Sequence, residues 1–343
     1  MEILVKEKIL VIQTAFLGDA VLTLPMIQKL KEKFKNSTLI VLCIPATKEL
    51  FEASPYVDDC IVYDKRGEQK SFYNFIKLIK YLRGLKLTNI YSPHRSFRSS
   101  LISFFSKAKF TTGFSTASFS FLYRKKIKYI SNHHEVARNL DLIGADTSRE
   151  KWKILPVIKI NNDYEKEINT LIKITGEKEI IAIAPGSVWQ TKIYPKDYFI
   201  EIIKALISMN FFVVLIGGKD DENLCIEIEK KIQIGIKSFA GKLNILESVA
   251  LLKKCRILIS NDSAPTHLGM IADIPTLTIF CSTIPAFGFF PYNKNSNVIS
   301  YDLLECKPCG IHGLKACPIK TFDCGIKLIP ENIITKLKRM AIL

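Results

Sequence analysis

Short runs of consecutive apolar residues alternate with amphipathic segments along most of the chain. Such runs are typical of strands that are buried on both faces of a parallel sheet. The segments between them repeat apolar side chains every three or four positions, which predicts helices. Strands are expected at residues 8–13, 38–43, 59–63, 88–91, 180–184, 211–216, 237–239, 257–259 and 276–280. Helices are expected at about residues 20–34, 71–82, 101–105, 164–174, 196–209, 246–253 and 331–340.

The alternation of strand and helix occurs in both halves of the chain. Between the halves, Pro156, Asn161 and Asn162 interrupt the pattern. The fold class expected is therefore α/β, with two doubly wound, Rossmann-like domains that face each other across a cleft. The domains are expected at residues 1–160 and 161–325, and the helix in residues 326–343 is expected to pack across the domain boundary.

Length and composition agree with two packed domains. The chain has 343 residues, of which 48% are hydrophobic and 24% charged. No apolar run approaches the roughly 20 residues that a membrane span needs. Charges are scattered through Met1–Lys8, and no apolar stretch typical of a signal peptide precedes the first strand. The expected location is the cytoplasm.

The formal net charge of +16 indicates an anionic partner. Nucleic acid, an anionic membrane and phosphorylated small molecules all satisfy that description. No RNA-binding signature, zinc-finger spacing or long basic helix accompanies the charge, so nucleic acid is not expected as a partner.

The stretch from residue 257 to residue 280 predicts a strand, a polar turn, a helix and a second strand. The turn, Ser260-Asn-Asp-Ser263, is rich in side chains that cap helices, and Pro265 falls in the first helical turn. The free amides and positive dipole end of a helix that follows a strand form a natural phosphate site. A plain βα turn that faces water has the same pattern, and the spacing alone does not choose between them.

Three further loops combine small and charged residues at the expected ends of strands. Gly18 permits close approach of a ligand, and Asp19 is either a helix-capping acid or a functional carboxylate at the sheet edge. The remaining candidates are the basic cluster His94, Arg95 and Arg98, which suits a carboxylate or phosphate, and the anion loop with Gly186, Ser187 and Lys192. Solvated loops remain the alternative reading for both.

Four of the nine cysteines cluster near the C-terminal end, at Cys306, Cys309, Cys317 and Cys324. Four thiolates suit a structural zinc ion. Disulfides and reduced thiols are the alternatives, and a cytoplasmic setting disfavours the disulfides.

Three stretches, in this order and at these separations, resemble a known family. They are Ile12–Pro25, Pro185–Pro195 with its Lys192-Ile-Tyr-Pro195, and Asn261-Asp-Ser-Ala-Pro-Thr-His267. The chain is similar to the lipopolysaccharide heptosyltransferases of glycosyltransferase family 9, which use ADP-heptose and have the GT-B fold. The resemblance covers nearly the whole chain.

The resemblance implies an inverting transfer of a heptose, or a related sugar, from an ADP-sugar to a hydroxyl group of the lipopolysaccharide inner core. No metal is required for the reaction it implies. Asp19 matches the general base, and Lys192 matches the lysine that neutralises the diphosphate leaving group. The implied donor-binding residues are Gly186, Ser187, Lys192, Asp262, Ser263, Ala264, Thr266 and His267.

The same resemblance implies that residues 1–160 bind the acceptor and that residues 161–325 bind the nucleotide sugar. Gly18, His94, Arg95 and Arg98 are then the acceptor-binding candidates. The implied partners are a nucleotide-sugar donor, an anionic lipid-linked glycan acceptor and the inner face of the cytoplasmic membrane, where the protein is peripheral.

Some positions depart from the family's usual pattern, namely Ala264-Pro-Thr-His267, Ile193-Tyr194 and Phe280-Cys281. A different sugar from a different nucleotide, added to another surface glycan, is therefore one alternative. A nucleotide-sugar-binding module without turnover is a second, although Asp19 and Lys192 are both present. A dinucleotide-dependent oxidoreductase is disfavoured, because no Gly-x-Gly-x-x-Gly follows the first strand.

Overall fold

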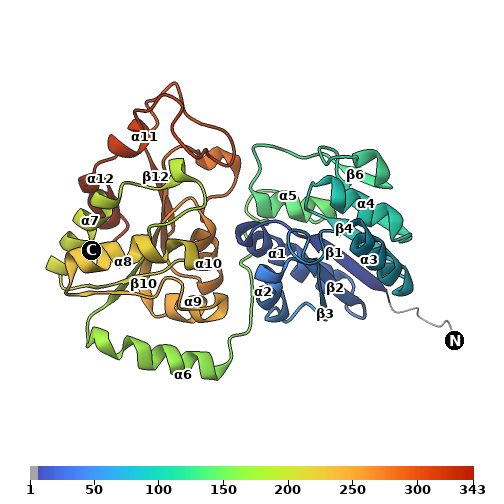
Figure 1. The fold of residues 1–343 in the computed structure, drawn as a ribbon, viewed down its shortest axis with the longest axis horizontal. Coiled ribbons are helices and arrows are strands. Elements are labelled where there is room, and N and C mark those ends of the chain that lie inside the picture. Colours follow the sequence, from blue (N-terminus) through green and yellow to red (C-terminus); the bar gives the residue numbers. More distant parts are fainter. Residues whose placement is uncertain (1–6) are drawn as a thin grey trace. The chain divides into compact units, whose positions relative to one another are not determined.

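The computed structural model describes residues 7–343. Residues 1–6, most of the segment considered above for a signal peptide, lie outside the described residues. The chain divides into two compact units after Lys159, and each unit is built on one six-stranded parallel sheet with helices packed on it (Figure 1). Between residues 7 and 343, no helix is long and apolar enough to cross a membrane.

The sheet of the first unit has the strand order β3-β2-β1-β4-β5-β6, and all its pairs are parallel. Its strands are β1 (Lys8–Gln13), β2 (Thr38–Cys43), β3 (Asp59–Val62), β4 (Asn89–Ser92), β5 (Phe110–Phe114) and β6 (Lys125–Ile127). Its helices are α1 (Leu17–Lys33), α2 (Lys48–Glu52), α3 (Phe72–Gly84), α4 (Phe97–Phe105) and α5 (Glu135–Leu142).

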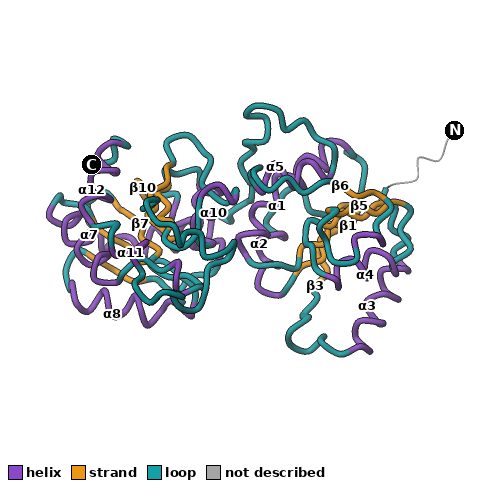
Figure 2. Tube along the Cα trace, turned by 90° about the horizontal axis from the view of Figure 1, so that it is seen from above, coloured by secondary structure: helices purple, strands orange, loops and turns teal. Residues whose placement is uncertain are grey.

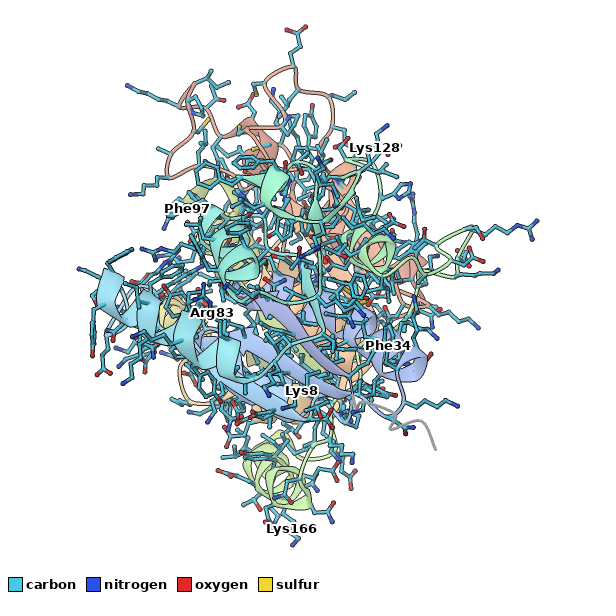
Figure 3. The ribbon with its side chains drawn as sticks, turned by 90° about the vertical axis from the view of Figure 1, so that its right-hand side faces the viewer. Lys8, Phe34, Arg83, Phe97, Lys128 and Lys166 are labelled. Atoms are coloured by element: carbon cyan, nitrogen blue, oxygen red, sulfur yellow. The ribbon has the colours of Figure 1, made fainter. Side chains whose placement is uncertain are left out.

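Helices α3 and α4 cover one face of this sheet. Their buried side chains, among them Ile79, Leu82 and Ile102, share a core with Leu10 and Ile12 of β1. Successive strand residues point to opposite faces, so the alternate residues of β1 point to the other side. Figure 2 shows α3 and α4 beside one another, and Figure 3 marks them with Arg83 and Phe97.

The second unit repeats the plan with the order β12-β11-β10-β7-β8-β9. Its strands are β7 (Ile180–Ala184), β8 (Phe212–Leu215), β9 (Ile236–Ser238), β10 (Cys255–Asn261), β11 (Thr276–Phe280) and β12 (Asn297–Ser300). Its helices are α6 (Asn162–Leu171), α7 (Lys196–Ser208), α8 (Glu222–Ile232), α9 (Ile245–Leu252), α10 (Ala264–Ala272), α11 (Asp323–Ile326) and α12 (Pro330–Arg339).

The α/β class and the two doubly wound sheets expected from the sequence are confirmed. Strands β5, β6 and β12 were not expected, because their sequences (FTTGF, KKI and NVIS) mix apolar residues with Gly, Thr, Lys or Asn. Helix α12 packs on α7, and its residues Ile333 and Leu337 are buried in the core of the second unit.

One helix start differs from the expectation in a way that bears on function. Helix α1 begins at Leu17 instead of Ala20, and its N-cap residue is Phe16, which makes no side-chain cap. Asp19 therefore lies within the first turn and does not cap the helix.

In each sheet the first three strands are added from the middle toward one edge, and the chain then returns to place the fourth strand on the other side of the first. The strand order therefore reverses between the first and fourth strands. This occurs between β1 and β4 in the first unit and between β7 and β10 in the second. Open parallel sheets bind ligands at the carboxyl ends of the two strands that flank such a point. The loops after these four strands contain nearly all of the candidate residues from the sequence.

Candidate functional site

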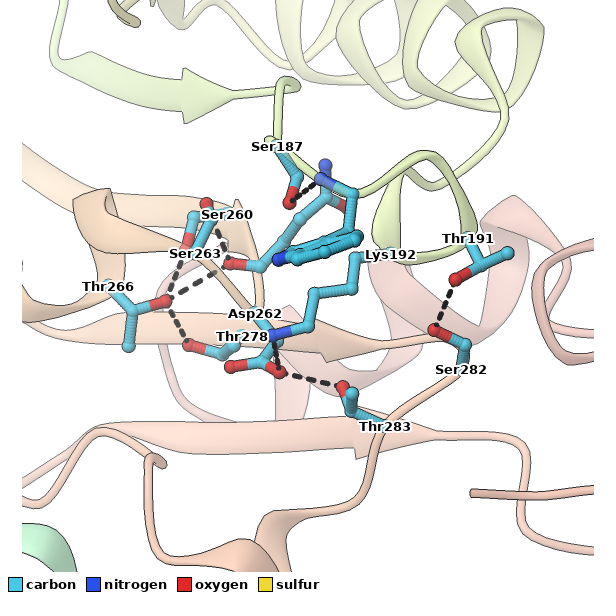
Figure 4. A network of polar contacts seen from close by, with 12 residues as sticks. Ser187, Thr191, Lys192, Ser260, Asp262, Ser263, Thr266, Thr278, Ser282 and Thr283 are labelled. Atoms are coloured by element: carbon cyan, nitrogen blue, oxygen red, sulfur yellow. Dashed lines mark hydrogen bonds and ion pairs between the residues drawn. The ribbon is translucent and has the colours of Figure 1, made fainter. Parts of the chain in front are cut away.

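An ion pair between Lys192 and Asp262 lies at the reversal point of the second sheet (Figure 4). Lys192 ends the short 3-10 helix Gln190–Lys192 that follows β7, and Asp262 follows β10 directly. The Lys192 Nζ is 2.7 Å from the Asp262 Oδ2, and the two side chains are 12% and 8% exposed. Thr283 Oγ1 donates a hydrogen bond of 2.6 Å to the same oxygen. A cation so withdrawn from water interacts strongly with any charge that approaches it.

The side chain of Asn261 joins the two loops that carry this pair. Its Nδ2 donates to the carbonyl of Pro185 at 2.7 Å, and its Oδ1 accepts from the backbone N–H of Tyr194 at 3.1 Å. Both ends of the segment 185–194 are therefore held by one buried amide. The Tyr194 hydroxyl in turn donates to the carbonyl of Leu328 at 2.5 Å.

Helix α10 begins at Ala264, and hydrogen bonds between hydroxyl groups attach its first turn to strands β10 and β11. Thr266 Oγ1 lies 2.7 Å from Ser260 Oγ and 3.0 Å from Thr278 Oγ1 (Figure 4). Ser263 is the N-cap residue, Ala264 begins the helix and Pro265 lies in its first turn. Pro265 has no N–H, and the N–H of Thr266 donates to the carbonyl of Ser263 at 3.1 Å, so the amide that the first helical turn leaves for an anion is that of Ala264.

His267 lies one turn further along α10 and is buried. Its Nδ1 has no hydrogen-bond partner among the described residues. Burial lowers the pKa of His267 to about 4, against the opposing effect of the Asp262 carboxylate. The ring is therefore neutral at physiological pH, with one nitrogen able to accept or donate a hydrogen bond.

Gly186 has a structural reason of its own to be glycine. A Cβ atom at this position would lie 1.8 Å from Oδ1 of Asp221, whose other oxygen accepts from the N–H of Gly218 at 2.9 Å. Burial raises the pKa of Asp221. Ser187 Oγ accepts from the N–H of Trp189 at 3.4 Å. The loop is thus shaped by its own packing, independently of any bound anion.

In the first unit, Asp19 lies near a buried acidic network. Glu135, the first residue of α5, pairs with Arg138 at 2.9 Å from Nε to Oε2 and accepts from the Tyr129 hydroxyl at 3.3 Å. Burial raises the pKa of Glu135 to about 7 against the effect of Arg138, and the charge of Asp19 raises it further. The carboxyl group of Asp19, in the first turn of α1, thus influences that of Glu135, at the start of α5.

A pocket of about 400 Å³ lies at the carboxyl ends of β1 to β4. Its lining includes Thr14, Lys65, Arg66 and His94. The Lys65 Nζ donates to the carbonyl of Thr14 at 2.5 Å, and His94 Nδ1 lies 2.9 Å from Thr14 Oγ1. Burial, aided by neighbouring arginines, lowers the pKa of Lys65 to about 8, and burial lowers that of His94 to about 4. Asp64 also lines the pocket, and its carboxylate accepts from the N–H groups of Gly67 and Glu68 at 2.8 and 3.3 Å. Lys65 and Arg66 together outweigh this one negative charge, so the lining is cationic near neutral pH.

The predicted cluster of His94, Arg95 and Arg98 is only partly brought together. Of the three, His94 alone lines the pocket. Arg98 does not line the pocket, but its guanidinium donates to the carbonyl of the lining residue Lys65 at 3.0 Å and so helps to position that residue. The Arg95 guanidinium lies 4.0 Å from the ring centroid of Tyr129, and the Arg138 guanidinium lies 4.6 Å from it. Tyr129 therefore holds Arg95 in place.

The four clustered cysteines line a small cavity of about 130 Å³. All nine cysteines are free thiols. Across residues 7–343, no group of three or more His, Cys, Asp or Glu side chains is arranged to hold a metal ion. The expected structural zinc site is therefore not supported.

Several residues of these sites were missed by the sequence analysis. Lys65 and Arg66 follow a weakly apolar strand. The only feature of the sequence that could have indicated a site there is that these two basic residues are adjacent in a charged segment. Thr283, Tyr129 and Glu135 carry no local signal, since their role depends on contacts with distant segments.

Comparison with known proteins gives a consistent result. The model of glycosyltransferase family 9 (heptosyltransferase) matches residues 75–315. The chain is 25% identical over 339 residues to lipooligosaccharide heptosyltransferase 2 of Campylobacter jejuni, which covers 97% of this chain and 99% of that protein. The family 9 glycosyl transferase of Veillonella parvula has the same fold, with a TM-score of 0.85, 20% identity and 97% of both chains covered. ADP-heptose LPS heptosyltransferase II of Escherichia coli has a TM-score of 0.79 and 20% identity, with 97% of this chain and 98% of that chain covered.

Two doubly wound sheets, each with a polar site at its reversal point, give the chain the GT-B fold, which it shares with these solved glycosyltransferases. Because the family model covers more than half of it, the chain belongs to glycosyltransferase family 9 (heptosyltransferase). The protein is an enzyme that transfers a glycosyl group, as the sequence analysis predicted.

Proposed function

We propose that this glycosyltransferase moves a heptose from ADP-heptose to a hydroxyl group of the inner core of lipopolysaccharide or lipooligosaccharide. The observation that carries the proposal is the desolvated Lys192–Asp262 pair beside the start of α10. The names of the relatives support the choice of sugar, nucleotide and acceptor, since they are heptosyltransferases acting on lipopolysaccharide or lipooligosaccharide.

The second unit, residues 161–325 in this proposal, binds the donor. Lys192 neutralises the charge that grows on the diphosphate as the glycosidic bond breaks, and the start of α10 supplies the backbone amide of Ala264 and the positive end of the helix dipole. The neutral His267 ring lies one turn away and keeps a free hydrogen-bonding nitrogen for the donor. The proposed donor-binding residues are Gly186, Ser187, Lys192, Asp262, Ser263, Ala264, Thr266 and His267. Lys192 supplies the cation at the diphosphate, so the proposed reaction requires no metal ion.

The first unit, residues 1–160 in this proposal, binds the acceptor. Asp19 takes the proton of the acceptor hydroxyl while the oxygen of that hydroxyl attacks the anomeric carbon of the donor sugar. The bond from this carbon to the diphosphate breaks as the new bond forms, so the configuration inverts in one displacement. Gly18 leaves room beside that carboxylate. The proposed acceptor-binding residues are His94 and Arg95, with Arg98 positioning Lys65 and Arg66 in the adjacent pocket. A cationic pocket suits the negative charges of an inner core sugar.

The proposed acceptor is linked to lipid, so the enzyme is proposed to work at the inner face of the cytoplasmic membrane. There it would be a peripheral protein. Its two partners in this proposal are the nucleotide-sugar donor and the anionic lipid-linked glycan.

Thermal unfolding with a panel of nucleotides tests the donor. A ligand that binds the folded state raises the melting temperature, so ADP is expected to stabilise the protein more than UDP, GDP, CDP or NAD at equal concentration. Lys192→Ala is expected to lose most of this stabilisation. Lys231→Ala is the matched control, because Lys231 forms an exposed ion pair with Asp197 on the same unit.

Transfer from ADP-heptose to purified inner core, followed by mass spectrometry, tests the reaction. Asp19→Ala is expected to abolish transfer while ADP still stabilises the variant. Preferential stabilisation by UDP or GDP would overturn the choice of ADP-heptose, and transfer by Asp19→Ala at the wild-type rate would remove Asp19 from the mechanism.

A further inference from the structure

The positive charge of the chain is concentrated in one stretch of the first unit. Between Glu68 and Glu135 the sequence contains no Asp or Glu and has thirteen Lys and Arg residues, against a net charge of +16 for the whole chain. Helices α3 and α4 both lie within this stretch. Only Arg95 and Arg98 of the thirteen belong to the proposed acceptor site. Most of this charge therefore has no role in the proposed reaction.

Helix α3 exposes large apolar side chains together with lysines. One side of the helix packs on the sheet through residues such as Ile79 and Leu82. On the opposite side, Phe72 and Tyr73 are 76% and 75% exposed. Ile76, Lys77, Lys80 and Tyr81 continue this exposed side along the helix. Ordinary surface helices present polar residues to water, so this face is unusual for a helix that lacks a partner.

Helix α4 continues the same kind of surface. Phe97, Phe104 and Phe105 are exposed, and the last two form an edge-to-face pair with ring centroids 5.2 Å apart. The Nε of Arg83, in the last turn of α3, donates to the carbonyl of Phe105 at 2.7 Å, so the two helix ends are joined. Figures 1 and 2 show the helices next to one another, and Figure 3 labels Arg83 and Phe97 on them.

We propose that this α3–α4 surface docks the enzyme on an anionic lipid bilayer. The surface is made of Phe72, Tyr73, Ile76, Lys77, Lys80, Tyr81, Arg83, Phe97, Phe104, Phe105 and Lys107. Aromatic rings settle at the level of the lipid headgroups, and lysines beside them attract anionic phosphates. Along the exposed side of α3, Lys77 and Lys80 lie between the apolar residues Phe72, Tyr73 and Ile76 and the ring of Tyr81, so one face of the helix carries both kinds of residue.

Charge complementarity selects a bilayer over a second copy of the chain. Two copies that met through this surface would bring lysines and arginines together, with no acidic residue between residues 69 and 134 to neutralise them. An anionic bilayer supplies the missing negative charge over the whole area. Lipid binding follows from the surface alone, whereas its benefit for transfer to a lipid-linked acceptor depends on the function proposed above.

Co-sedimentation of the full chain with vesicles tests the proposal. The wild type is expected to bind vesicles of phosphatidylethanolamine and phosphatidylglycerol, to bind phosphatidylcholine vesicles far less, and to dissociate partly as salt is raised. Lys77→Glu/Lys80→Glu is expected to lower the partition coefficient at least about tenfold. Lys253→Glu/Lys254→Glu is the matched control, because it makes the same charge change at exposed positions of the second unit.

A second pair of variants separates the aromatic contribution from the charge. Phe72→Ser/Tyr73→Ser is expected to weaken binding to the anionic vesicles while leaving its salt dependence in place. Ile234→Ser/Leu303→Ser removes equally exposed apolar side chains from the second unit and should bind as the wild type does. Melting temperatures establish that each variant is folded.

The outcomes test the docking proposal separately from the proposed transfer reaction. Transfer to a lipid-free core oligosaccharide should be unchanged in Lys77→Glu/Lys80→Glu, while transfer to acceptor embedded in vesicles should fall. Absence of binding by the wild type, or equal binding by the surface variants and their controls, would overturn the docking proposal and would favour a protein partner for this face. If the thermal unfolding experiments showed that ADP-heptose is not the donor, the expected binding to vesicles would not change.

Discussion

The Lys192 Nζ lies 2.7 Å from the Asp262 Oδ2, and neither side chain has much contact with water. The ammonium group is thus held in place before any donor arrives. In the proposed reaction a diphosphate must share this cation with Asp262. Two negative groups then compete for one positive group, and this competition can be measured.

Asp262→Asn keeps the shape of the side chain and removes its charge. Breaking a buried ion pair leaves an uncompensated charge, so the variant is expected to lose about 3 kcal/mol of unfolding free energy. ADP should then raise its melting temperature more than that of the wild type, because the diphosphate replaces the missing anion. The donor contact proposed for Asp262 is therefore not one to the diphosphate of ADP. Equal or smaller shifts would show that the diphosphate does not approach Lys192. The surface pair variant Asp197→Asn should change stability by less than about 1 kcal/mol.

The buried Glu135 gives the folded state a pH dependence. Its pKa is raised from 4.5 to about 7, so the folded state binds more protons than the unfolded state between these values. Stability attributable to this group is therefore full at acidic pH and falls by about 3 kcal/mol as the pH rises from 4.5 through 7. Urea unfolding at several pH values should show that Glu135→Gln loses this dependence. A parallel decline in both proteins would place its origin elsewhere.

Lys65 predicts a pH dependence of acceptor binding. Its pKa is lowered to about 8 by burial, so the ammonium form that suits an anionic acceptor is lost as the pH rises through 8. The KM for the acceptor is expected to rise above that pH. Lys65→Arg keeps its charge there and should flatten the profile, whereas Lys65→Ala should have a high KM at every pH. An unaltered profile in Lys65→Arg would exclude Lys65 as its source.

Tyr129 is expected to act through Arg95, whose guanidinium lies 4.0 Å from the ring centroid. A cation–π contact of this kind contributes about 1 kcal/mol. Tyr129→Leu should therefore raise the KM for the acceptor about fivefold and leave the ADP-induced shift in melting temperature unchanged. Tyr129→Phe keeps the ring and loses only the 3.3 Å hydrogen bond to Glu135, so its KM should stay near that of the wild type. A high KM in both variants would assign the effect to the hydroxyl.

Gly186 and Asp221 are expected to be coupled. A Cβ at position 186 would lie 1.8 Å from the Asp221 carboxylate, so Gly186→Ala should destabilise the protein by about 1–3 kcal/mol. Gly186→Ala/Asp221→Ala removes the obstacle and should recover part of that loss in urea unfolding. Additive effects of the two changes would show that other contacts restrict the loop.

The sequence was sufficient to locate the segments that carry the candidate site residues. Apolar runs located β1, β7 and β10, and the polar segments after them contain Asp19, Lys192 and Asp262. Which residues approach these three from elsewhere was not predictable, because it depends on the order of strands in the sheet. Lys65 follows β3, two strands away from β1, and reaches Thr14 only once that order is set.

Local sequence also says little about the neighbours that a side chain contacts. That Arg98 binds an anion stays a prediction, and nothing in the sequence indicated that its guanidinium also donates to the carbonyl of Lys65. The four C-terminal cysteines have a spacing that suits a metal and line one small cavity, but among residues 7–343 no three ligand side chains are arranged to hold a metal ion. In both cases the residue type suggested a possible ligand, but the sequence did not predict which groups the side chain contacts in the structure.

The buried amide of Asn261 links the loop after β7 to the loop after β10 through Pro185 and Tyr194. Neither loop can change shape without disturbing the other. Both partners of this amide are backbone groups, so side chains in residues 185–194 can be replaced without removing either hydrogen bond. The conformation of both loops therefore depends on one side chain, that of Asn261, while the chemistry that the loops present is carried by the residues around it.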